Sequence, residues 1–519
     1  MNGAQALIRT LVDHDVDVCF MNPGTSEMHF VAALDQVPEM RGVLALFEGV
    51  ATGAADGYGR MAGRPAATLL HLGPGLGNGV ANLHNARRAH TPVVNIVGDH
   101  ATYHKAYDAQ LESDIDAVAS NVSPGFVRRT QRADDVVADA LDALTAAIGP
   151  PGQVATLILP ADASWSDTTV TSGPSRPVRE APVDVDRVEA VAKVLRSGEP
   201  VALFVGGRVV RGDALTRAGA VCAATGAKLL CEPFPARLER GAGRVAVERL
   251  GYLAEFATAQ LDGLAHLVLV DAASPVSFFA YPGKASDLVP EGCAVHELAG
   301  PADDAPGALA ALAELVGAVA GDAVLQPPGR PDAPSGELTA QTVCAALGAL
   351  LPEGAIVSDE GNTTGLFAAG ATAGAPPHDW LCLTGGAIGQ GLPVAVGAAV
   401  ACPDRRVVAF ESDGSALYTL QSWWTMASEG LDVTTILLNN GSYAVLNMEL
   451  DRVGAEASGP RAKRMLRLDP PALDFVALAN GMGVPATRAT TADELVDQLG
   501  RSLATPGPSV VEAIVPSII

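Results

Sequence analysis

The chain has 519 residues, of which 48% are hydrophobic and 18% charged, and its formal net charge at pH 7 is −24. This length exceeds one ordinary domain and predicts roughly three. The composition excludes a largely disordered chain. The acidic balance disfavours nucleic acid and anionic membranes as partners, because both select basic surfaces.

Cellular context can also be read from the sequence. Asp13, Asp15 and Asp17 interrupt any apolar run of a secretory signal. The richest apolar stretch, 308–320, is too short for a membrane span and contains Glu314. The seven cysteines form no C-x-x-C pair, which is typical of buried thiols in a reducing compartment. We therefore expect a cytoplasmic protein.

Two segments rich in Pro, Gly and Ser, 171–177 and 326–334, are typical of linkers between domains. They divide the chain into domains at 1–170, 185–325 and 337–519.

Each domain alternates short β-rich runs with helical patterns. In chain order, the predicted strands cover 43–47, 67–72, 93–97, 201–205, 267–270, 355–357, 407–410 and 433–438. Alternation of this kind predicts parallel sheets with helices on both faces. The expected fold is therefore three doubly wound α/β domains.

Glu48 follows the first predicted strand directly, and a helix is expected over 49–61. Acidic residues are favoured in the first turn of a helix because of its dipole, so a structural role is a sufficient explanation. However, the neighbours Phe47, Val50 and Ala51 are apolar, and a buried carboxylate at a strand end is also a candidate for proton transfer.

The next strand ends at His71, and four glycines lie between 73 and 79 before a helix expected from about Val80. A glycine-rich turn after a strand is weak evidence for a dinucleotide site, and the only acidic residue in the expected position is Asp99. Gly206-Gly207, after the strand at 201–205, is a second weak candidate. An NAD-dependent dehydrogenase is therefore an alternative class.

The most informative segment is 406–443, which has the pattern strand, helix, strand. In such a unit the strands are parallel and both carboxyl ends lie at one edge of the sheet. Asp413 follows one strand and Asn440 the other, and Ser415 is placed to cap the helix between them. Hard oxygen ligands suit Mg²⁺, and a helix N-terminus suits a phosphate. A Mg²⁺–diphosphate site is predicted, although each residue alone is also a common turn or cap residue.

Taken together, these motifs resemble those of thiamine diphosphate-dependent enzymes of the acetolactate synthase and benzoylformate decarboxylase group. The resemblance covers nearly the whole chain. It is most specific at NPGT (22–25), Glu48, ADGYGR (55–60), DGS (413–415) and NNG (439–441). The family's metal motif, Gly-Asp-Gly followed by Asn-Asn, is matched except that Ser412 replaces the first glycine.

The resemblance implies a pyrimidine-binding first domain, a central domain and a diphosphate-binding third domain. It implies a homodimer or homotetramer with the cofactor between the first domain of one subunit and the third domain of its neighbour. The implied Mg²⁺ ligands are Asp413, Asn440 and the carbonyl of Ser442. The implied cofactor contacts are Glu48 at the pyrimidine, Ile388 beneath the bent cofactor, the carbonyl of Gly386, and Gly361, Asn362, Gly414, Ser415, Asn440 and Tyr443.

The chemistry implied by the resemblance is cleavage of a 2-oxo acid. Glu48 shares a proton with the pyrimidine, the cofactor ylid attacks the substrate carbonyl, and CO₂ leaves. Protonation then gives an aldehyde, and attack on a second carbonyl gives an acyloin or, as in acetolactate synthesis, a longer acid.

His71 bears on this choice because its position resembles the active-site histidine of benzoylformate decarboxylase, and a histidine can relay protons near neutral pH. A histidine that only packs at a strand end is an equal alternative. Thr25 falls where the decarboxylase has a serine, and Gln110 where synthases have a glutamine. The decarboxylase's second histidine falls near Phe278, where this chain has none.

The expected function is therefore a 2-oxo acid decarboxylase or carboligase. An acetolactate synthase-type transferase is the alternative, and a binding protein without catalysis is a further one. Acetolactate synthases also bind FAD in the central domain, and this central segment shows no convincing match to those contacts, so FAD is not expected.

Overall fold

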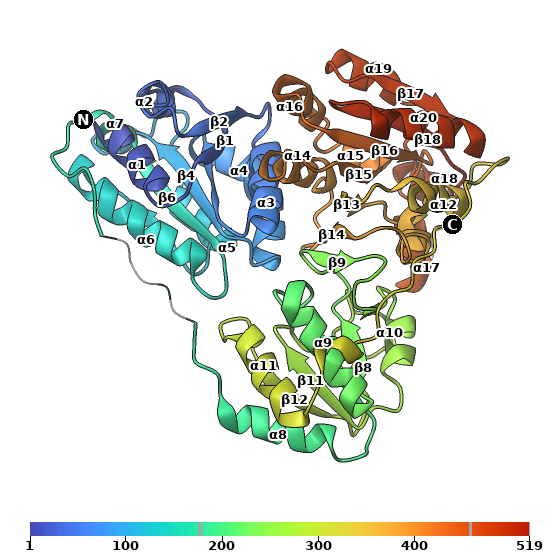
Figure 1. The fold of residues 1–519 in the computed structure, drawn as a ribbon. Coiled ribbons are helices and arrows are strands. Elements are labelled where there is room, and N and C mark those ends of the chain that lie inside the picture. Colours follow the sequence, from blue (N-terminus) through green and yellow to red (C-terminus); the bar gives the residue numbers. More distant parts are fainter. Residues whose placement is uncertain (175–177, 179, 456–458, 518–519) are drawn as a thin grey trace.

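The computed structural model describes residues 1–174, 178, 180–455 and 459–517, and it contains three sheets (Figure 1). The part of the predicted linker at 175–177 lies outside the described residues. Each sheet is built from neighbouring parallel strands flanked by helices, which confirms the predicted class of three α/β domains. No helix within the described residues is long and apolar enough to cross a membrane.

The first domain has a six-stranded sheet in the order β2-β1-β3-β4-β6-β5, and all pairs are parallel. Its helices and strands are α1 (Gly3–Val12), β1 (Val18–Asn22), η1 (Thr25–Glu27), α2 (Met28–Ala33), β2 (Arg41–Leu44), α3 (Glu48–Ala62), β3 (Ala66–Leu70), α4 (Leu72–Arg88), β4 (Val93–Asp99), η2 (Lys105–Tyr107), α5 (Ile115–Val122), β5 (Val127–Arg129), η3 (Ala133–Asp135), α6 (Val136–Ile148), β6 (Val154–Pro160) and α7 (Ala161–Trp165).

Two expectations for this domain need correction. Strand β2 ends at Leu44 rather than at 47, and α3 begins at Glu48 itself. The glycine-rich segment 73–79 is not a loop, because α4 begins at Leu72 with His71 as its N-cap residue. The glycines fit a helix because its neighbours are very close: a Cβ on Gly79 would lie 2.9 Å from Thr52 of α3. Close packing, rather than a bound phosphate, explains this glycine.

The central domain has a five-stranded parallel sheet in the order β10-β8-β7-β11-β12. The elements of this segment are α8 (Val185–Leu195), β7 (Val201–Val205), α9 (Gly212–Thr225), β8 (Lys228–Cys231), β9 (Leu238–Arg240), β10 (Glu248–Arg249), α10 (Ala254–Leu261), β11 (His266–Val270), β12 (Ala294–Ala299), α11 (Ala305–Val316) and η4 (Ala320–Asp322).

The third domain has a seven-stranded sheet in the order β17-β18-β16-β15-β13-β14-β9. Strand β9 comes from the central segment and pairs antiparallel with β14, so this segment completes the edge of the third sheet. The elements are α12 (Ala340–Leu350), β13 (Ile356–Glu360), η5 (Thr364–Phe367), α13 (Ala368–Ala371), β14 (His378–Cys382), α14 (Gly391–Ala401), β15 (Val407–Ser412), α15 (Asp413–Ala416), α16 (Gln421–Glu429), β16 (Val433–Asn439), α17 (Ala444–Arg452), α18 (Pro460–Met465), α19 (Phe475–Gly481), β17 (Ala486–Ala489), α20 (Ala492–Ala504) and β18 (Ser509–Ile514).

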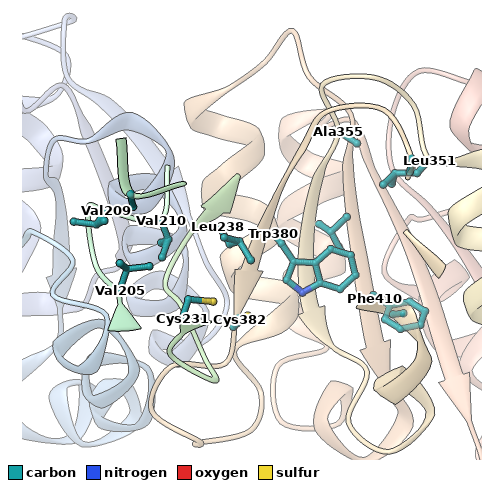
Figure 2. Close-up of a cluster of buried hydrophobic side chains, with 14 of the residues drawn as sticks. Val205, Val209, Val210, Cys231, Leu238, Leu351, Ala355, Trp380, Cys382 and Phe410 are labelled. Atoms are coloured by element: carbon teal, nitrogen blue, oxygen red, sulfur yellow. The ribbon is translucent and has the colours of Figure 1, made fainter. Parts of the chain in front are cut away.

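One hydrophobic core continues from the central domain into the third domain (Figure 2). Leu238 of β9 lies between Cys231 of the central sheet and Trp380 of β14 in this view. Trp380 is fully buried, and its indole N–H donates to Asp359 Oδ2 at 2.9 Å. Leu238 and Trp380 are register partners of β9 and β14, so their shared burial holds β9 against the third sheet.

The first and third domains pack through α3 and α14. A Cβ on Gly397 would lie 1.8 Å from the carbonyl oxygen of Ala54, and one on Gly57 would lie 2.1 Å from that of Val394. Any side chain at these positions would separate the helices, so the glycines set their close approach. This contact brings the N-termini of α3 and α14 near each other.

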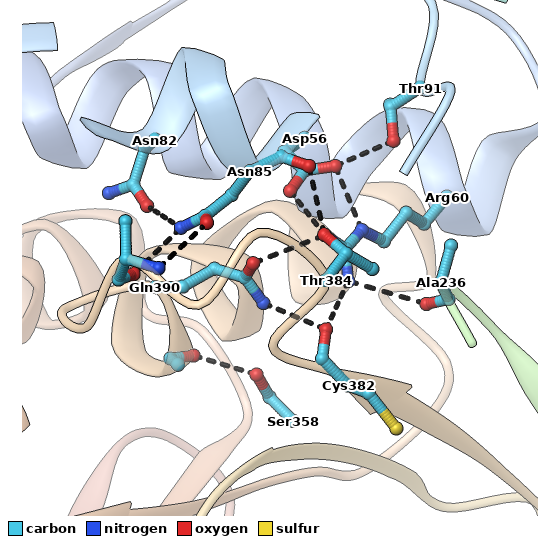
Figure 3. A network of polar contacts seen from close by, with 12 residues as sticks. Asp56, Arg60, Asn82, Asn85, Thr91, Ala236, Ser358, Cys382, Thr384 and Gln390 are labelled. Atoms are coloured by element: carbon cyan, nitrogen blue, oxygen red, sulfur yellow. Dashed lines mark hydrogen bonds and ion pairs between the residues drawn. The ribbon is translucent and has the colours of Figure 1, made fainter. Parts of the chain in front are cut away.

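A buried polar network joins all three domains beside these helices (Figure 3). Arg60 of α3 forms a fully buried ion pair with Asp56, at 2.5 Å. Its guanidinium also donates to the carbonyls of Cys382 (2.8 Å) and Ala236 (3.3 Å) and to the hydroxyl of Thr384 (2.9 Å). The ion pair with Asp56 lies within α3, but the three hydrogen bonds to Cys382, Ala236 and Thr384 cross to the other domains. Arg60 therefore fixes the first domain against the central and third domains.

Candidate active site

The carboxyl edge of the third sheet carries the residues expected to bind metal. Strands β13, β15 and β16 are neighbours in the sheet, and Asp413 and Asn440 immediately follow β15 and β16. Asp413 Oδ2 accepts the backbone N–H groups of Gly441 (2.7 Å) and Asn440 (3.1 Å), and Oδ1 accepts that of Gly414 (2.8 Å). The two loops are thus joined through one carboxylate.

The Asp413 carboxylate is buried, and burial raises its pKa to about 6. The described residues contain no salt bridge to Asp413 and no group of three His, Cys, Asp or Glu side chains placed to hold a metal. One carboxylate with amide and carbonyl oxygens fits Mg²⁺, which takes few protein ligands and completes its shell with phosphate and water. Asn440 Oδ1 accepts the N–H of Ser442 at 2.9 Å and retains a second lone pair for a ligand.

Ser415 does not have the capping role predicted for it. The short helix α15 begins at Asp413 with Ser412 as the preceding cap residue, so Ser415 lies inside the turn. Its hydroxyl donates to Glu411 Oε1 at 2.6 Å. The ring of Tyr443 covers Gly414, where a Cβ would lie 2.6 Å from it.

The loop after β13 lies beside this turn. Asn362 has a φ of +45°, and its amide donates to the carbonyl of Glu360 (3.1 Å) and to the hydroxyl of Ser412 (3.2 Å). Gly361 packs on the ring of Phe410, which would lie 2.7 Å from a Cβ. The structure therefore brings the 361–362 loop and the Asp413 turn together.

The segment before α14 contains Gly386 and Ile388. Gly386 has a φ of +73°, and the ring of Phe278 from the central domain would lie 2.6 Å from its Cβ. Ile388 is partly buried. The side-chain amide of Asn85 pairs with the backbone of Ala387, which fixes this segment against α4 (2.8 and 3.2 Å; Figure 3).

Glu48 is the first residue of α3 and is only 6% exposed. Its Oε2 accepts a hydrogen bond from Asn78 at 3.0 Å. Asn82 donates to the carbonyls of both Gly49 (2.8 Å) and Gly389 (3.2 Å), so the start of α3 and the segment before α14 meet within one chain.

The predicted residue His71 has a partner that the sequence did not reveal, Glu27, and the pair lies near Glu48. His71 Nδ1 lies 2.7 Å from Glu27 Oε2, and the Glu27 side chain is 1% exposed. Burial raises the pKa of the Glu27 carboxyl, and the His71 ring opposes that shift. Glu48 Oε1 and His71 Cβ both lie against Gly75, 3.2 and 3.4 Å from where its Cβ would be. Glu48 and the Glu27–His71 pair therefore lie against the same glycine of α4.

The contact between Glu27 and His71 makes the histidine able to transfer a proton through its other ring nitrogen. A carboxylate at Nδ1 favours a proton on that nitrogen and leaves Nε2 free to take up or release one. The N–H of Gly24 also donates to Glu27 Oε2 at 2.8 Å, whereas Glu27 Oε1 is buried without a hydrogen-bond partner within the described residues. Glu27 and His71 are 44 residues apart in the chain, so no local pattern predicts their pairing. The one local feature of Glu27 is its position three residues after Gly24, whose N–H it accepts.

The remaining predicted residues are more exposed. Thr25 is the first residue of η1 and is exposed. Gln110 is exposed in the segment between η2 and α5, and no hydrogen-bond partner for its side chain is found among the residues that the structure describes. The structure therefore does not join Gln110 to the Glu27–His71 pair.

The central domain does not fit a flavin or nicotinamide diphosphate at the switch point of its sheet. Gly206-Gly207 follows β7, which pairs in parallel with β8 on one side and with β11 on the other, so the strand order reverses at this point. The N–H of Gly207 is bonded to Glu232 (3.1 Å) and that of Arg208 to Asp271 (2.8 Å). Two carboxyl groups thus occupy the backbone N–H donors that a phosphate would need at this turn.

Comparison with known protein families shows which family the chain belongs to. Residues 1–120 match the family described as thiamine pyrophosphate enzyme, N-terminal TPP binding domain, and residues 359–513 match the corresponding C-terminal TPP binding domain. The chain belongs to the thiamine pyrophosphate enzymes. The family implied by the sequence motifs is thereby confirmed.

Relatives of the chain within this family are named as acetolactate synthases or as benzoylformate decarboxylases. A Mycobacterium tuberculosis protein named "Putative acetolactate synthase large subunit IlvX" is 61% identical, with all of both chains covered. The benzoylformate decarboxylase of Pseudomonas aeruginosa is 29% identical, with 96% of both chains covered.

The fold is also that of a solved thiamine pyrophosphate enzyme. The thiamine diphosphate-dependent 4-hydroxybenzoylformate decarboxylase of Rhodococcus jostii RHA1 has a TM-score of 0.86 over 99% of both chains, at 23% identity.

Proposed function

We propose that the protein is a thiamine diphosphate- and Mg²⁺-dependent decarboxylase or carboligase of 2-oxo acids, similar in its chemistry to benzoylformate decarboxylase. The observation that carries this proposal is the buried Glu27–His71 pair beside Glu48. Thiamine diphosphate supplies, when bound, a carbon nucleophile for the substrate carbonyl and takes up the electron pair left by departing CO₂.

The protein's own groups hold the cofactor and exchange protons. Asp413, Asn440 and the carbonyl of Ser442 are the proposed Mg²⁺ ligands. Glu48 is assigned the proton exchange at the pyrimidine nitrogen, and its burial keeps water from that proton. The other proposed cofactor contacts are Gly361, Asn362, Gly386, Ile388, Gly414, Ser415 and Tyr443.

His71 is assigned the proton that converts the decarboxylated substrate into an aldehyde. Its Nδ1 is held by Glu27, so Nε2 is the nitrogen available to the substrate. The side chain of His71 is 23% exposed, which leaves it accessible from the site. Thr25 and Gln110 are proposed to contact the substrate.

An acetolactate synthase-type transfer between two 2-oxo acids is the second candidate. The name of the relative that is 61% identical favours it. FAD is not proposed for either reaction, because the carboxylates of Glu232 and Asp271 occupy the phosphate-binding donors of the central domain. We expect purified protein to carry no flavin absorbance.

We further propose a homodimer or homotetramer in which the cofactor lies between the first domain of one subunit and the third domain of the next. The family relationship supports this arrangement, since both domain models of the family match the chain.

The proposal is tested by measuring CO₂ release from pyruvate, benzoylformate and branched 2-oxo acids. Protein stripped with a chelator should be inactive, and Mg²⁺ with thiamine diphosphate together should restore activity. Release of CO₂ without added cofactor from stripped protein, or no release from any 2-oxo acid, would overturn it.

A further inference from the structure

Two buried glutamates lie side by side next to the cofactor segments, and the proposed reaction uses neither. Glu360 ends β13, and Glu411 is the next-to-last residue of β15. They are register partners in neighbouring parallel strands, and both are almost completely buried. Like charges opposite one another in a sheet are destabilising, so this pair calls for an explanation.

Glu360 binds the start of α14 with both carboxylate oxygens. Oε1 accepts the N–H of Gly389 at 2.8 Å, and Oε2 accepts that of Gly391 at 2.5 Å. Ser358, on the same strand, donates to the carbonyl of Gly391 at 2.8 Å (Figure 3). The end of β13 therefore holds the segment that follows Gly386 and Ile388, through bonds to its backbone.

Glu411 has a different environment. Its Oε1 accepts the hydroxyl of Ser415 at 2.6 Å, in the turn that begins with Asp413. Its Oε2 is buried and has no hydrogen-bond partner within the described residues. A Cβ on Gly391 would lie 2.2 Å from this oxygen and 3.0 Å from Glu360 Oε2. The two carboxylates therefore converge on Gly391, and only glycine fits between them.

We propose that Glu360 is a positioning residue that holds the segment 385–389 in the shape in which it meets thiamine diphosphate. This inference rests on the proposed cofactor contacts of Gly386 and Ile388. Glu360 is the only one of the two glutamates that binds the segment, and Glu411 packs behind it and contacts the metal-side turn. The pair thus links the pyrimidine half of the third-domain site to its diphosphate half.

The matched variants Glu360→Gln and Glu411→Gln separate this role from simple charge repulsion. Each removes one carboxylate of the pair. In Glu360→Gln, the amide NH₂ would face a backbone N–H that needs an acceptor. In Glu411→Gln, the amide oxygen can still accept the hydroxyl of Ser415, and the bonds from Glu360 to Gly389 and Gly391 are left in place. If the pair were only a source of repulsion, both variants would behave alike.

Thiamine diphosphate affinity is measured by calorimetry with Mg²⁺ present. We expect Glu360→Gln to raise the dissociation constant by roughly tenfold or more, since a lost hydrogen bond to a charged group has this size. Glu411→Gln should stay within about threefold of the wild type. Equal affinities in the two variants would overturn the inference. Failure of the wild type to bind thiamine diphosphate would instead overturn the proposed function.

Hydrogen exchange gives a readout that does not depend on the cofactor. In Glu360→Gln, the amides of Gly389 and Gly391 should exchange faster than in the wild type, whereas in Glu411→Gln they should not. If Glu360→Gln does not fold, Glu360→Asp provides the same comparison, because its carboxylate is too short to bind both N–H groups. Unchanged exchange at both glycines would contradict the role of Glu360.

Discussion

His71 pairs with the buried carboxylate of Glu27, and the buried carboxylate of Glu48 lies against the same glycine, Gly75. Glu27 holds Nδ1 of the ring, and Glu48 accepts from Asn78. These hydrogen bonds hold the side chains that are proposed to exchange protons in fixed positions. Three experiments test the proposed proton transfers and the metal ligand.

Glu48→Gln removes the proposed proton exchange at the pyrimidine but preserves the shape of the side chain. We expect turnover to fall by about 10²- to 10⁴-fold, the usual contribution of a general acid or base. Binding of Mg²⁺ and the melting temperature should remain close to those of the wild type. Steady-state kinetics and calorimetry measure the two effects, and full activity in this variant would refute the role of Glu48.

Glu27→Gln tests whether the carboxylate acts through His71. We expect aldehyde formation to fall by roughly tenfold or more in both Glu27→Gln and His71→Ala, with thiamine diphosphate affinity preserved. Because both changes remove one function, the double variant should be no slower than His71→Ala alone. Fully multiplicative losses in this cycle would mean that Glu27 acts independently of the histidine.

Asp413 makes the affinity for Mg²⁺ depend on pH. The carboxylate must be ionised to bind the metal, and burial raises its pKa to about 6. The affinity should be constant above pH 7 and should fall by about tenfold per pH unit well below pH 6. Calorimetric titrations from pH 5 to 8 measure this, with Asp413→Asn as the control that lacks the response. A constant affinity down to pH 5 would contradict the assignment of this ligand.

Helices α3 and α14 pack closely within the chain, and both adjoin proposed site residues, since Glu48 begins α3 and the segment 385–389 precedes α14. Their backbones approach through Gly57 and Gly397. A sequence pattern of glycines in a helix is usually interpreted as flexibility or weak helix propensity. Here the contact shows that these glycines are needed for packing.

Gly397→Ala should therefore destabilise the protein. The new methyl group would lie 1.8 Å from the carbonyl of Ala54, and overpacking of this kind costs about 1–3 kcal/mol, or about 1–3 °C in melting temperature for a chain of this length. Gly500→Ala in α20 is the matched control, because nothing lies within 4 Å of its Cβ position. It should leave the melting temperature unchanged or raise it. Equal effects of the two variants would show that α3 and α14 are not packed this closely.

Some elements of the fold and the site could be predicted from the sequence, and others could not. The α/β class and the places of Asp413 and Asn440 at strand ends followed from local patterns, because strand periodicity and turn residues are local signals. The start of α4 at Leu72 and the pairing of β9 with β14 did not, since both depend on neighbours distant in the chain. For the same reason, the Glu27–His71 and Glu360–Glu411 pairs required the three-dimensional structure.

Arg60 contacts residues of the other two domains, so all three domains meet at this side chain, close to the segment that precedes α14. Strand β9 adds the central segment to the third sheet, and the shared core of Figure 2 extends across that junction. The relative positions of the domains therefore depend on buried contacts rather than on the linkers alone. We interpret the protein as one catalytic unit whose parts are not independent.

In the proposed reaction, His71 delivers a proton to the decarboxylated substrate. The most direct test is to identify by NMR the products formed from pyruvate and from benzoylformate, with thiamine diphosphate and Mg²⁺ and with or without FAD. The account predicts the aldehyde as the main product, with no effect of FAD. Acetolactate as the main product from the wild type would contradict this role of His71 and assign the protein to the synthase reaction.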